Sequence, residues 1–282
     1  MVQKPLLIFD LEGTLGEIFL KKDTGSHPPF MFLRPKLFDG LNDLRQSSNN
    51  YMIALATSIN SEELSYFTEY LKKQGFEFDG LYDGTLTSAN PPKSSTIIHF
   101  KDLSRVYDDF RISPEELSDR VLVIEDLQLS DDEIFVGEKI FKSLDREVTI
   151  SQKAQDLIYK DGAYNTYGNP LPKNGYTPTV LLVPNPRLSY YKSMPMGEII
   201  SLINATYESG QGSFGNGFCE LNRDDVLKLE TDVLRIDPRI FSFGAGAENN
   251  SFVKAVTSDF KQKYLILVPG DKPTLPYEKV II

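Results

Sequence analysis

Residues 6–15 read Leu-Leu-Ile-Phe-Asp-Leu-Glu-Gly-Thr-Leu, and this stretch sets the expectation for the fold. An apolar run that ends in a carboxylate is typical of a buried parallel strand with an acid at its carboxyl end. Ligands of open α/β sheets bind at that edge, and Gly13 permits a tight turn there. Asp10 and Glu12 are therefore placed to face one phosphate group or one cation. An ordinary surface acid followed by a turn glycine is the alternative.

Two further apolar runs end in polar residues. Residues 51–56 are followed by Thr57 and Ser58, and residues 121–124 are followed by Glu125 and Asp126. Helical patterns with capping signals lie between these runs, for example after Asn60 and after Ser113. The alternation of strand and helix predicts an α/β fold with a doubly wound parallel sheet.

The rest of the chain is expected to be less regular. Residues 16–29 read as a loop or a short flap, and about 133–178 as an insertion. A fourth strand at 180–184 and a helix at 197–207 complete a core domain over residues 1–209, with no large cap. The Gly/Ser stretch 210–217 reads as a linker to a C-terminal α+β extension over residues 210–282.

Composition limits the classes of function. The chain has 282 residues and a formal net charge of −10, which argues against a general nucleic-acid binder. One cysteine and two histidines exclude an internal disulfide and leave zinc or redox chemistry unsupported. No segment reads as a signal peptide or a bilayer span, so a cytoplasmic protein is expected.

The order of the polar strand ends resembles the four-motif plan of the haloacid-dehalogenase (HAD) superfamily of phosphatases. The resemblance is clear over residues 6–126 and looser through the helix that ends near Tyr207. It implies that Asp10 is the nucleophile and that Glu12 is the general acid/base. It also implies that Thr57 and a lysine, Lys101 or its rival Lys93, bind the phosphoryl oxygens.

Local details resemble one branch of that superfamily, which contains the RNA polymerase C-terminal-domain (NLI-interacting factor-like) phosphatases and the magnesium-dependent protein-tyrosine phosphatases. The details are Arg34-Pro35 before a helix, Thr57-Ser58, and Lys101 before the strand that ends in acids. The resemblance implies that Arg34, Thr57 and Ser58 bind substrate. It also implies that Mg²⁺ is held by Asp10, the carbonyl of Glu12 and Asp126, oxygen ligands of the kind Mg²⁺ prefers.

Two positions depart from this pattern, because Glu12 and Glu125 stand where these phosphatases carry Asp. The leading hypothesis is a magnesium-dependent phosphatase that acts on a phosphoprotein. A catalytically impaired binding module and a small-molecule phosphatase are the alternatives. The extension is a candidate for contact with a partner protein or a lipid.

Overall fold

The computed structural model describes most of the first half of the chain and separate segments of the second half. The described residues are 4–19, 30–89, 100–127, 169–170, 173–174, 176–184, 192–220, 232–236, 263–268, 275–276 and 278–281. Lys93 lies outside these ranges, and so does most of the expected insertion at about 133–178.

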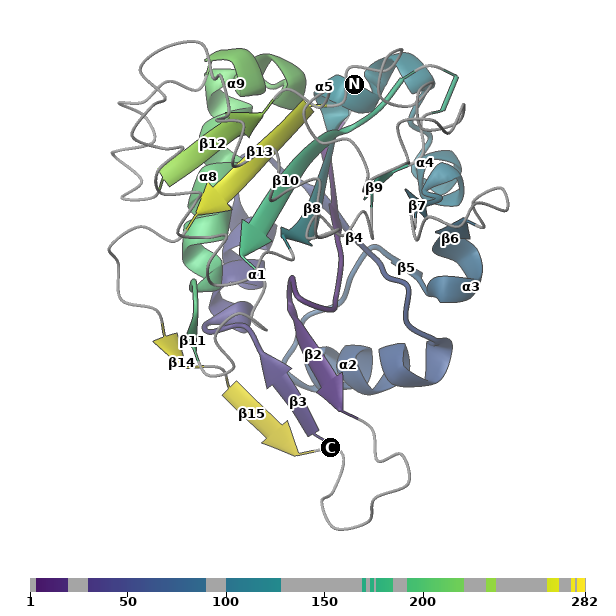
Figure 1. The fold of residues 1–282 in the computed structure, drawn as a ribbon, viewed down its shortest axis with the longest axis vertical. Helices are drawn as coiled ribbons and strands as arrows, with labels where there is room; N and C mark the ends of the chain where they lie inside the picture. Colours follow the sequence, from purple (N-terminus) through teal and green to yellow (C-terminus); the bar gives the residue numbers. More distant parts are fainter. Residues whose placement is uncertain are drawn as a thin grey trace, which may run out of the picture.

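Strands and helices are interspersed along the chain (Figure 1). Those of the first half are β1 (Leu6–Phe9), β2 (Gly16–Phe19), β3 (Phe30–Leu33), α1 (Leu37–Gln46), β4 (Met52–Ala56), α2 (Ser61–Lys73), β5 (Gly80–Tyr82), α3 (Gly84–Thr87), β6 (Ser88–Ala89), β7 (Phe100–Lys101), α4 (Ser104–Asp109), the 3₁₀ helix η1 (Pro114–Glu116), α5 (Leu117–Arg120) and β8 (Val121–Leu127). Those of the second half are β9 (Asn169–Pro170), β10 (Thr179–Pro184), β11 (Lys192–Ser193), α8 (Met196–Ser209), α9 (Phe214–Glu220), β12 (Asp232–Ile236), β13 (Lys263–Val268), β14 (Leu275–Pro276) and β15 (Glu278–Ile281).

One seven-stranded sheet organises the molecule, with the strand order β12-β13-β10-β8-β1-β4-β5. Every neighbouring pair from β13 to β5 is parallel, and β12 runs antiparallel to β13. The chain moves outward from β1 to β4 and β5, then crosses to β8 on the other side of β1. This reversal lies next to β1, and ligands of open α/β sheets bind at such a point, at the carboxyl ends of the strands. The predicted α/β fold with a parallel sheet flanked by helices is confirmed, and the arrangement is compatible with a Rossmann-like core.

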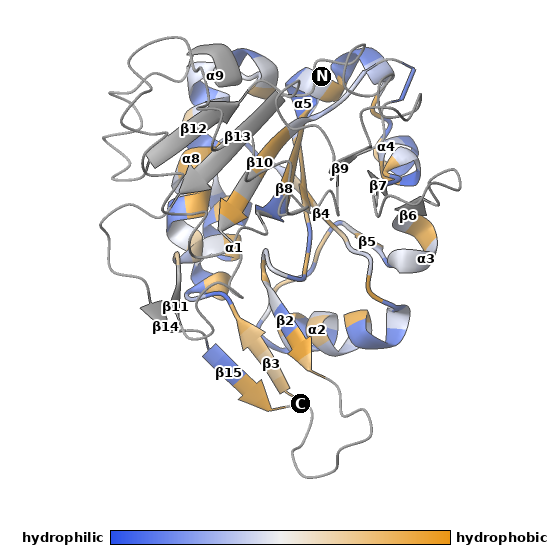
Figure 2. Cartoon of the chain, viewed as in Figure 1, coloured by the Kyte–Doolittle hydropathy of each residue, from blue (hydrophilic) through white to orange (hydrophobic). Residues whose placement is uncertain are grey.

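The core lies against the sheet because the central strands β1, β4 and β8 are apolar over most of their length (Figure 2). On one face, Leu7 and Phe9 of β1 belong to the same buried cluster as Leu41 of α1 and Phe67 of α2. Leu6 and Ile8 alternate with them and are buried on the opposite face. The apolar colour of β8 gives way to hydrophilic residues at its carboxyl end, where Glu125 follows Ile124 (Figure 2).

The local capping signals are confirmed. The Asn60 side chain caps α2 by accepting a hydrogen bond from the backbone N–H of Glu63 at 2.9 Å. Ser113 and Glu116 form the expected capping box around η1. These caps satisfy backbone donors that have no partner within the helix, so they fix where each helix begins.

The segment after β1 contains regular structure that the sequence reading did not assign. Its described parts, β2 and β3, pair antiparallel, and β15 pairs with the other edge of β3. Met31 and Leu33 of β3 are buried in the core, while Phe30 and Phe32 alternate with them. Burial alternates with a period of two over 30–33, but the sequence there is apolar throughout, so no alternation in the sequence marked the strand.

The linker prediction at 210–217 is wrong, because these residues form a tight turn and most of α9. Phe214 is fully buried, with its ring centroid 4.9 Å from that of Tyr207. A Cβ at Gly217 would lie 1.7 Å from the carbonyl oxygen of Thr206, so the glycine permits α8 and α9 to touch. Strands β12 and β13 join the main sheet, and β15 joins β3, so a boundary at 209/210 does not separate two units.

Candidate metal centre

Three acidic side chains meet at the carboxyl ends of β1 and β8. The register pairs Phe9 with Ile124, so Asp10 leaves β1 at the level where Glu125 continues β8. The backbone N–H of Asp10 donates to the carbonyl of Ile124 at 2.9 Å, which extends the pairing by one step. Adjacent parallel strands therefore bring together acids that are 115 residues or more apart in sequence.

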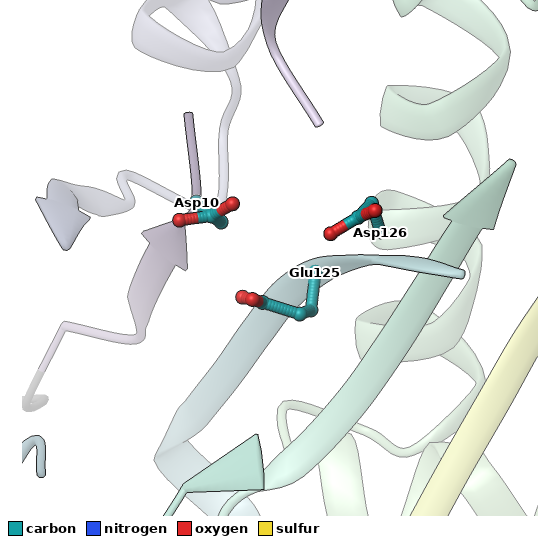
Figure 3. A group of neighbouring side chains, drawn as sticks. All are labelled: Asp10, Glu125 and Asp126. Atoms are coloured by element: carbon teal, nitrogen blue, oxygen red, sulfur yellow. The ribbon is translucent and has the colours of Figure 1, made fainter. Parts of the chain in front are cut away.

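The carboxyl groups of Asp10, Glu125 and Asp126 each offer one oxygen such that these oxygens lie within 4.8 Å of one another. Figure 3 shows Glu125 and Asp126 reaching from β8 toward the side where Asp10 lies. The three residues are only 5, 4 and 7% exposed, respectively. Buried carboxylates are costly unless a cation or hydrogen-bond donors balance them, so this group is suited to hold a metal ion.

Lys101 supplies a positive charge to this group. Its Nζ lies 2.8 Å from Asp10 Oδ1 and 2.9 Å from Glu125 Oε2, with the second Glu125 oxygen at 3.1 Å. The lysine side chain is itself buried. Two hydrogen bonds connect β7, which carries Lys101, to the end of β4. The N–H of Asp102 donates to the carbonyl of Thr87, and the Thr87 hydroxyl donates to the carbonyl of Thr57.

The pKa values follow from burial and charge. Burial disfavours the ammonium form of Lys101, but the carboxylates of Asp10 and Glu125 outweigh it and raise its pKa above the ordinary 10.5. Lys101 is therefore positively charged at neutral pH. Burial and the charge of Asp10 raise the pKa of Glu125 well above its ordinary 4.5, against the opposing effect of Lys101. Three carboxyl groups facing one ammonium group explain this direction.

Gly13 shapes the wall of the site next to Asp126. Its φ of +76° lies in the left-handed region, and a Cβ there would lie 2.6 Å from the carboxyl carbon of Asp126. Both conditions favour glycine. The turn is closed by hydrogen bonds from the N–H groups of Leu15 and Gly16 to the carbonyl of Leu11.

Arg34 does not lie among the acids. Its guanidinium is fully buried and donates to the backbone carbonyls of Gly13 (3.0 Å), Met194 (3.1 Å) and Thr14. These contacts hold the turn after β1 against the segment that leads into α8. This placement is a physical argument against the prediction that Arg34 binds substrate.

The other predicted site residues lie at the same edge or next to it. Thr57 is buried after β4, and its hydroxyl accepts a 3.4 Å hydrogen bond from the N–H of Ile59. Ser58 is exposed beside it. Glu12 is half-buried in the turn, and its side chain is not a member of the acidic group found among the described residues.

Glu125 is the residue whose place at the centre was not predicted from sequence. The resemblance left Glu125 out of the implied metal ligands, and in the structure both of its carboxylate oxygens accept hydrogen bonds from Lys101. The acidic pair at the end of a predicted strand was the available signal. What the sequence lacked was the strand order, which makes β8 the neighbour of β1.

Comparisons with protein-family models and with curated proteins find no match for this sequence. The chemistry of the site therefore has to be argued from its geometry. An all-oxygen set of carboxylates suits hard divalent cations such as Mg²⁺, Mn²⁺ or Ca²⁺ more than Zn²⁺ or Cu²⁺. Within the described residues, no helix is both long and apolar enough to cross a membrane.

Proposed function

We propose that this chain is a magnesium-dependent phosphomonoester hydrolase of the HAD type, with Asp10 as the nucleophile. The observation that carries the proposal is the contact between the buried Asp10 carboxylate and Lys101. One oxygen of Asp10 also lies within 4.8 Å of carboxylate oxygens of Glu125 and Asp126. A nucleophilic carboxylate, a fixed cation and further acidic ligands at one sheet edge are the parts that phosphoryl transfer needs.

Asp10, Asp126 and the carbonyl of Glu12 are the groups proposed to hold Mg²⁺. When bound, Mg²⁺ offsets the negative charge of the phosphate group and of the carboxylates. Glu125 is proposed to hold Lys101 rather than to bind the cation, since both of its oxygens contact Nζ. The protein's own part is to keep these groups buried and fixed before the substrate arrives.

The reaction proceeds in two steps in this proposal. A carboxylate oxygen of Asp10 attacks phosphorus, and the bond from phosphorus to the ester oxygen breaks as Glu12 gives a proton to the leaving alcohol. Water then attacks the aspartyl-phosphate, Glu12 takes its proton, and inorganic phosphate leaves with Asp10 restored. Lys101, charged at neutral pH, and Thr57 stabilise the phosphoryl oxygens in both steps.

A phosphoprotein is the proposed substrate, because no large cap is expected after Leu15 or between Thr57 and Lys101 to close the site over a small metabolite. A catalytically impaired binding module is the second candidate. It is favoured by Glu12, which replaces the expected Asp and whose side chain is not among the three clustered acids of the described part.

The test is turnover of p-nitrophenyl phosphate with Mg²⁺ by the wild type and by Asp10→Asn. We expect Asp10→Asn to lose on the order of 10³-fold or more in kcat, since no other described group replaces the nucleophile. Asp39→Asn, an exposed acid in the first turn of α1, is the matched control and should keep full activity. Equal turnover by wild type and Asp10→Asn would exclude the proposed mechanism.

Two further arms separate the candidates. Chelation should abolish turnover and added Mg²⁺ should restore it, whereas an impaired module shows neither. Loss of turnover in Glu12→Ala would support its acid/base role. A panel of phosphotyrosine, phosphoserine and phosphothreonine peptides compared with phosphorylated metabolites then distinguishes a phosphoprotein from a small-molecule substrate.

A further inference from the structure

Arg34 is the largest fully buried side chain among the described residues. Its three described hydrogen bonds go to backbone carbonyls from two distant segments: Gly13 and Thr14 in the turn after β1, and Met194 before α8. Burying a guanidinium is unfavourable unless hydrogen bonds compensate for lost water. A residue placed this way fixes geometry through several directed bonds.

The geometry that Arg34 fixes belongs to the acidic group. Nη2 donates to the Gly13 carbonyl, and Gly13 packs against the Asp126 carboxyl group with no room for a Cβ. Asp10 enters the same turn from β1. The turn that separates Asp10 from Gly13 is therefore held on one side by β8 and on the other by the guanidinium.

The α8 side of this connection is also fixed. Met196, the first residue of α8, donates its backbone N–H to the carbonyl of Pro35 at 2.9 Å, next to Arg34. Residues 34–35 thus bond to both the site turn and the start of α8. Lysine could keep the charge at position 34, but one ammonium group cannot reproduce the planar set of donors that spans three carbonyls.

We infer that Arg34 is a positioning residue for the cation site: it sets the turn at Gly13 and thereby the place of Asp126 relative to Asp10. This inference rests on the cation site of the proposed function, and it replaces the substrate-binding role that the resemblance implied for Arg34. A group that orients metal ligands without touching the metal affects metal affinity by about 10- to 100-fold.

The test uses Mg²⁺ alone, titrated calorimetrically into the full chain. Arg34→Lys and Arg34→Met are compared with wild type at a temperature where thermal scans show each protein folded. We expect the dissociation constant for Mg²⁺ to rise about tenfold or more in both variants. The matched control is Arg45→Lys. On the protein surface, Arg45 also donates to a backbone carbonyl, that of Glu77, and to a carboxylate, that of Asp79. The Mg²⁺ affinity of Arg45→Lys should equal that of wild type.

A purely structural role would lower the thermal midpoint of the Arg34 variants and leave the Mg²⁺ affinity of the folded protein unchanged, and that result overturns the inference. If wild type itself binds no Mg²⁺, the cation site of the proposed function fails and this inference fails with it. If wild type and Arg34→Lys bind equally, only the role of Arg34 is refuted.

A measurement on the wild type covers the case in which neither Arg34 variant folds. In ¹⁵N-arginine-labelled protein, the Arg34 Nε–H signal is assigned from its proximity to Thr14. We expect this signal to exchange slowly with solvent and to shift on addition of saturating Mg²⁺. A Nε–H signal that Mg²⁺ leaves unmoved would overturn the inference.

Discussion

Two buried cations lie near the end of β1, and their described hydrogen bonds go to different kinds of group. Lys101 contacts the carboxylates of Asp10 and Glu125, while Arg34 donates to the carbonyls of Gly13, Thr14 and Met194. Lys101 is a compact point charge, and the planar guanidinium of Arg34 directs several donors at once. The side-chain chemistry of each residue suits the partners that the fold gives it.

The comparison distinguishes the charge that Lys101 supplies to the acidic group from the geometry that Arg34 is inferred to fix. Replacing Lys101 removes a positive charge that faces the acids and that the proposed function places at the incoming phosphate, so we expect the largest loss in kcat. Replacing Arg34 leaves the charges of the acidic group in place and alters where the turn holds them. Gly13 connects Arg34 to the acidic group, because its carbonyl accepts a hydrogen bond from Arg34 and its Cα side packs against Asp126.

The largest effect is expected for Lys101→Met. The methionine fills a similar volume without the charge, so the phosphoryl oxygens lose a fixed donor, and kcat for p-nitrophenyl phosphate should fall by about 10²- to 10³-fold. Lys173→Met is the control, because Lys173 contacts Asp108 away from the centre. Undiminished kcat in Lys101→Met, with Lys93→Met inactive, would transfer the role to Lys93.

A smaller effect is expected for Gly13→Ala. The left-handed φ and the contact with Asp126 should together destabilise the fold by about 1–3 kcal/mol, seen as a lower free energy of unfolding in urea. Gly75→Ala has the same kind of φ, +86°, but no atom within 4 Å of the added Cβ. Only Gly13→Ala should also weaken Mg²⁺ binding; an equal effect on Mg²⁺ from both variants would contradict the packing argument.

The smallest effect concerns pH. Because the folded pKa of Glu125 is raised, the folded state binds more protons than the unfolded state above pH 4.5. Its stabilising contribution is complete below that value and is lost as pH rises through the folded pKa. Without divalent cations, thermal midpoints measured from pH 5 to 8 should therefore fall less steeply in Glu125→Gln than in wild type. Lys101 does not interfere, since its contribution changes only above pH 10.5.

Glu116 serves as a control, because its pKa is shifted in the opposite direction to that of Glu125. Burial tends to raise its pKa, but the backbone N–H of Ser113 and the charge of Arg120 outweigh that effect and lower it. Its stabilising contribution is present above pH 4.5 and is lost as pH falls. The difference in thermal midpoint between Glu116→Gln and wild type should therefore become smaller toward acid pH. Parallel pH curves for Glu125→Gln and wild type would contradict the assigned direction.

Sequence reasoning predicted the parts of the fold that rest on local patterns. The apolar runs at β1, β4, β8 and β10 and the caps at Asn60 and Ser113 were all identifiable, because burial and hydrogen bonding act on neighbouring residues. Asp10, Lys101 and Asp126 were predicted for the site, and the structure brings Asp10 and Asp126 into one group with Lys101 in contact with Asp10.

Long-range packing accounts for the failures. Gly210 and Gly217 were interpreted as flexible positions, but α8 and α9 cross there and leave no space for a side chain. The strand β15 pairs with β3 although more than 240 residues separate them, and no local pattern encodes that pairing. The substrate-binding role of Arg34 was implied only by the resemblance and stays a prediction, while its contacts with the turn and with Met194 are long-range and were not predicted from sequence.

The most direct test of the account is calorimetric titration of Mg²⁺ into the wild type and into Asp126→Asn. The account predicts saturable binding at one site in wild type, and its loss in Asp126→Asn with the fold retained in thermal scans, because Asp126 is a proposed ligand in the buried acidic group. Binding of equal affinity in both proteins, or no binding in wild type, would contradict the claim that these acids form a cation site.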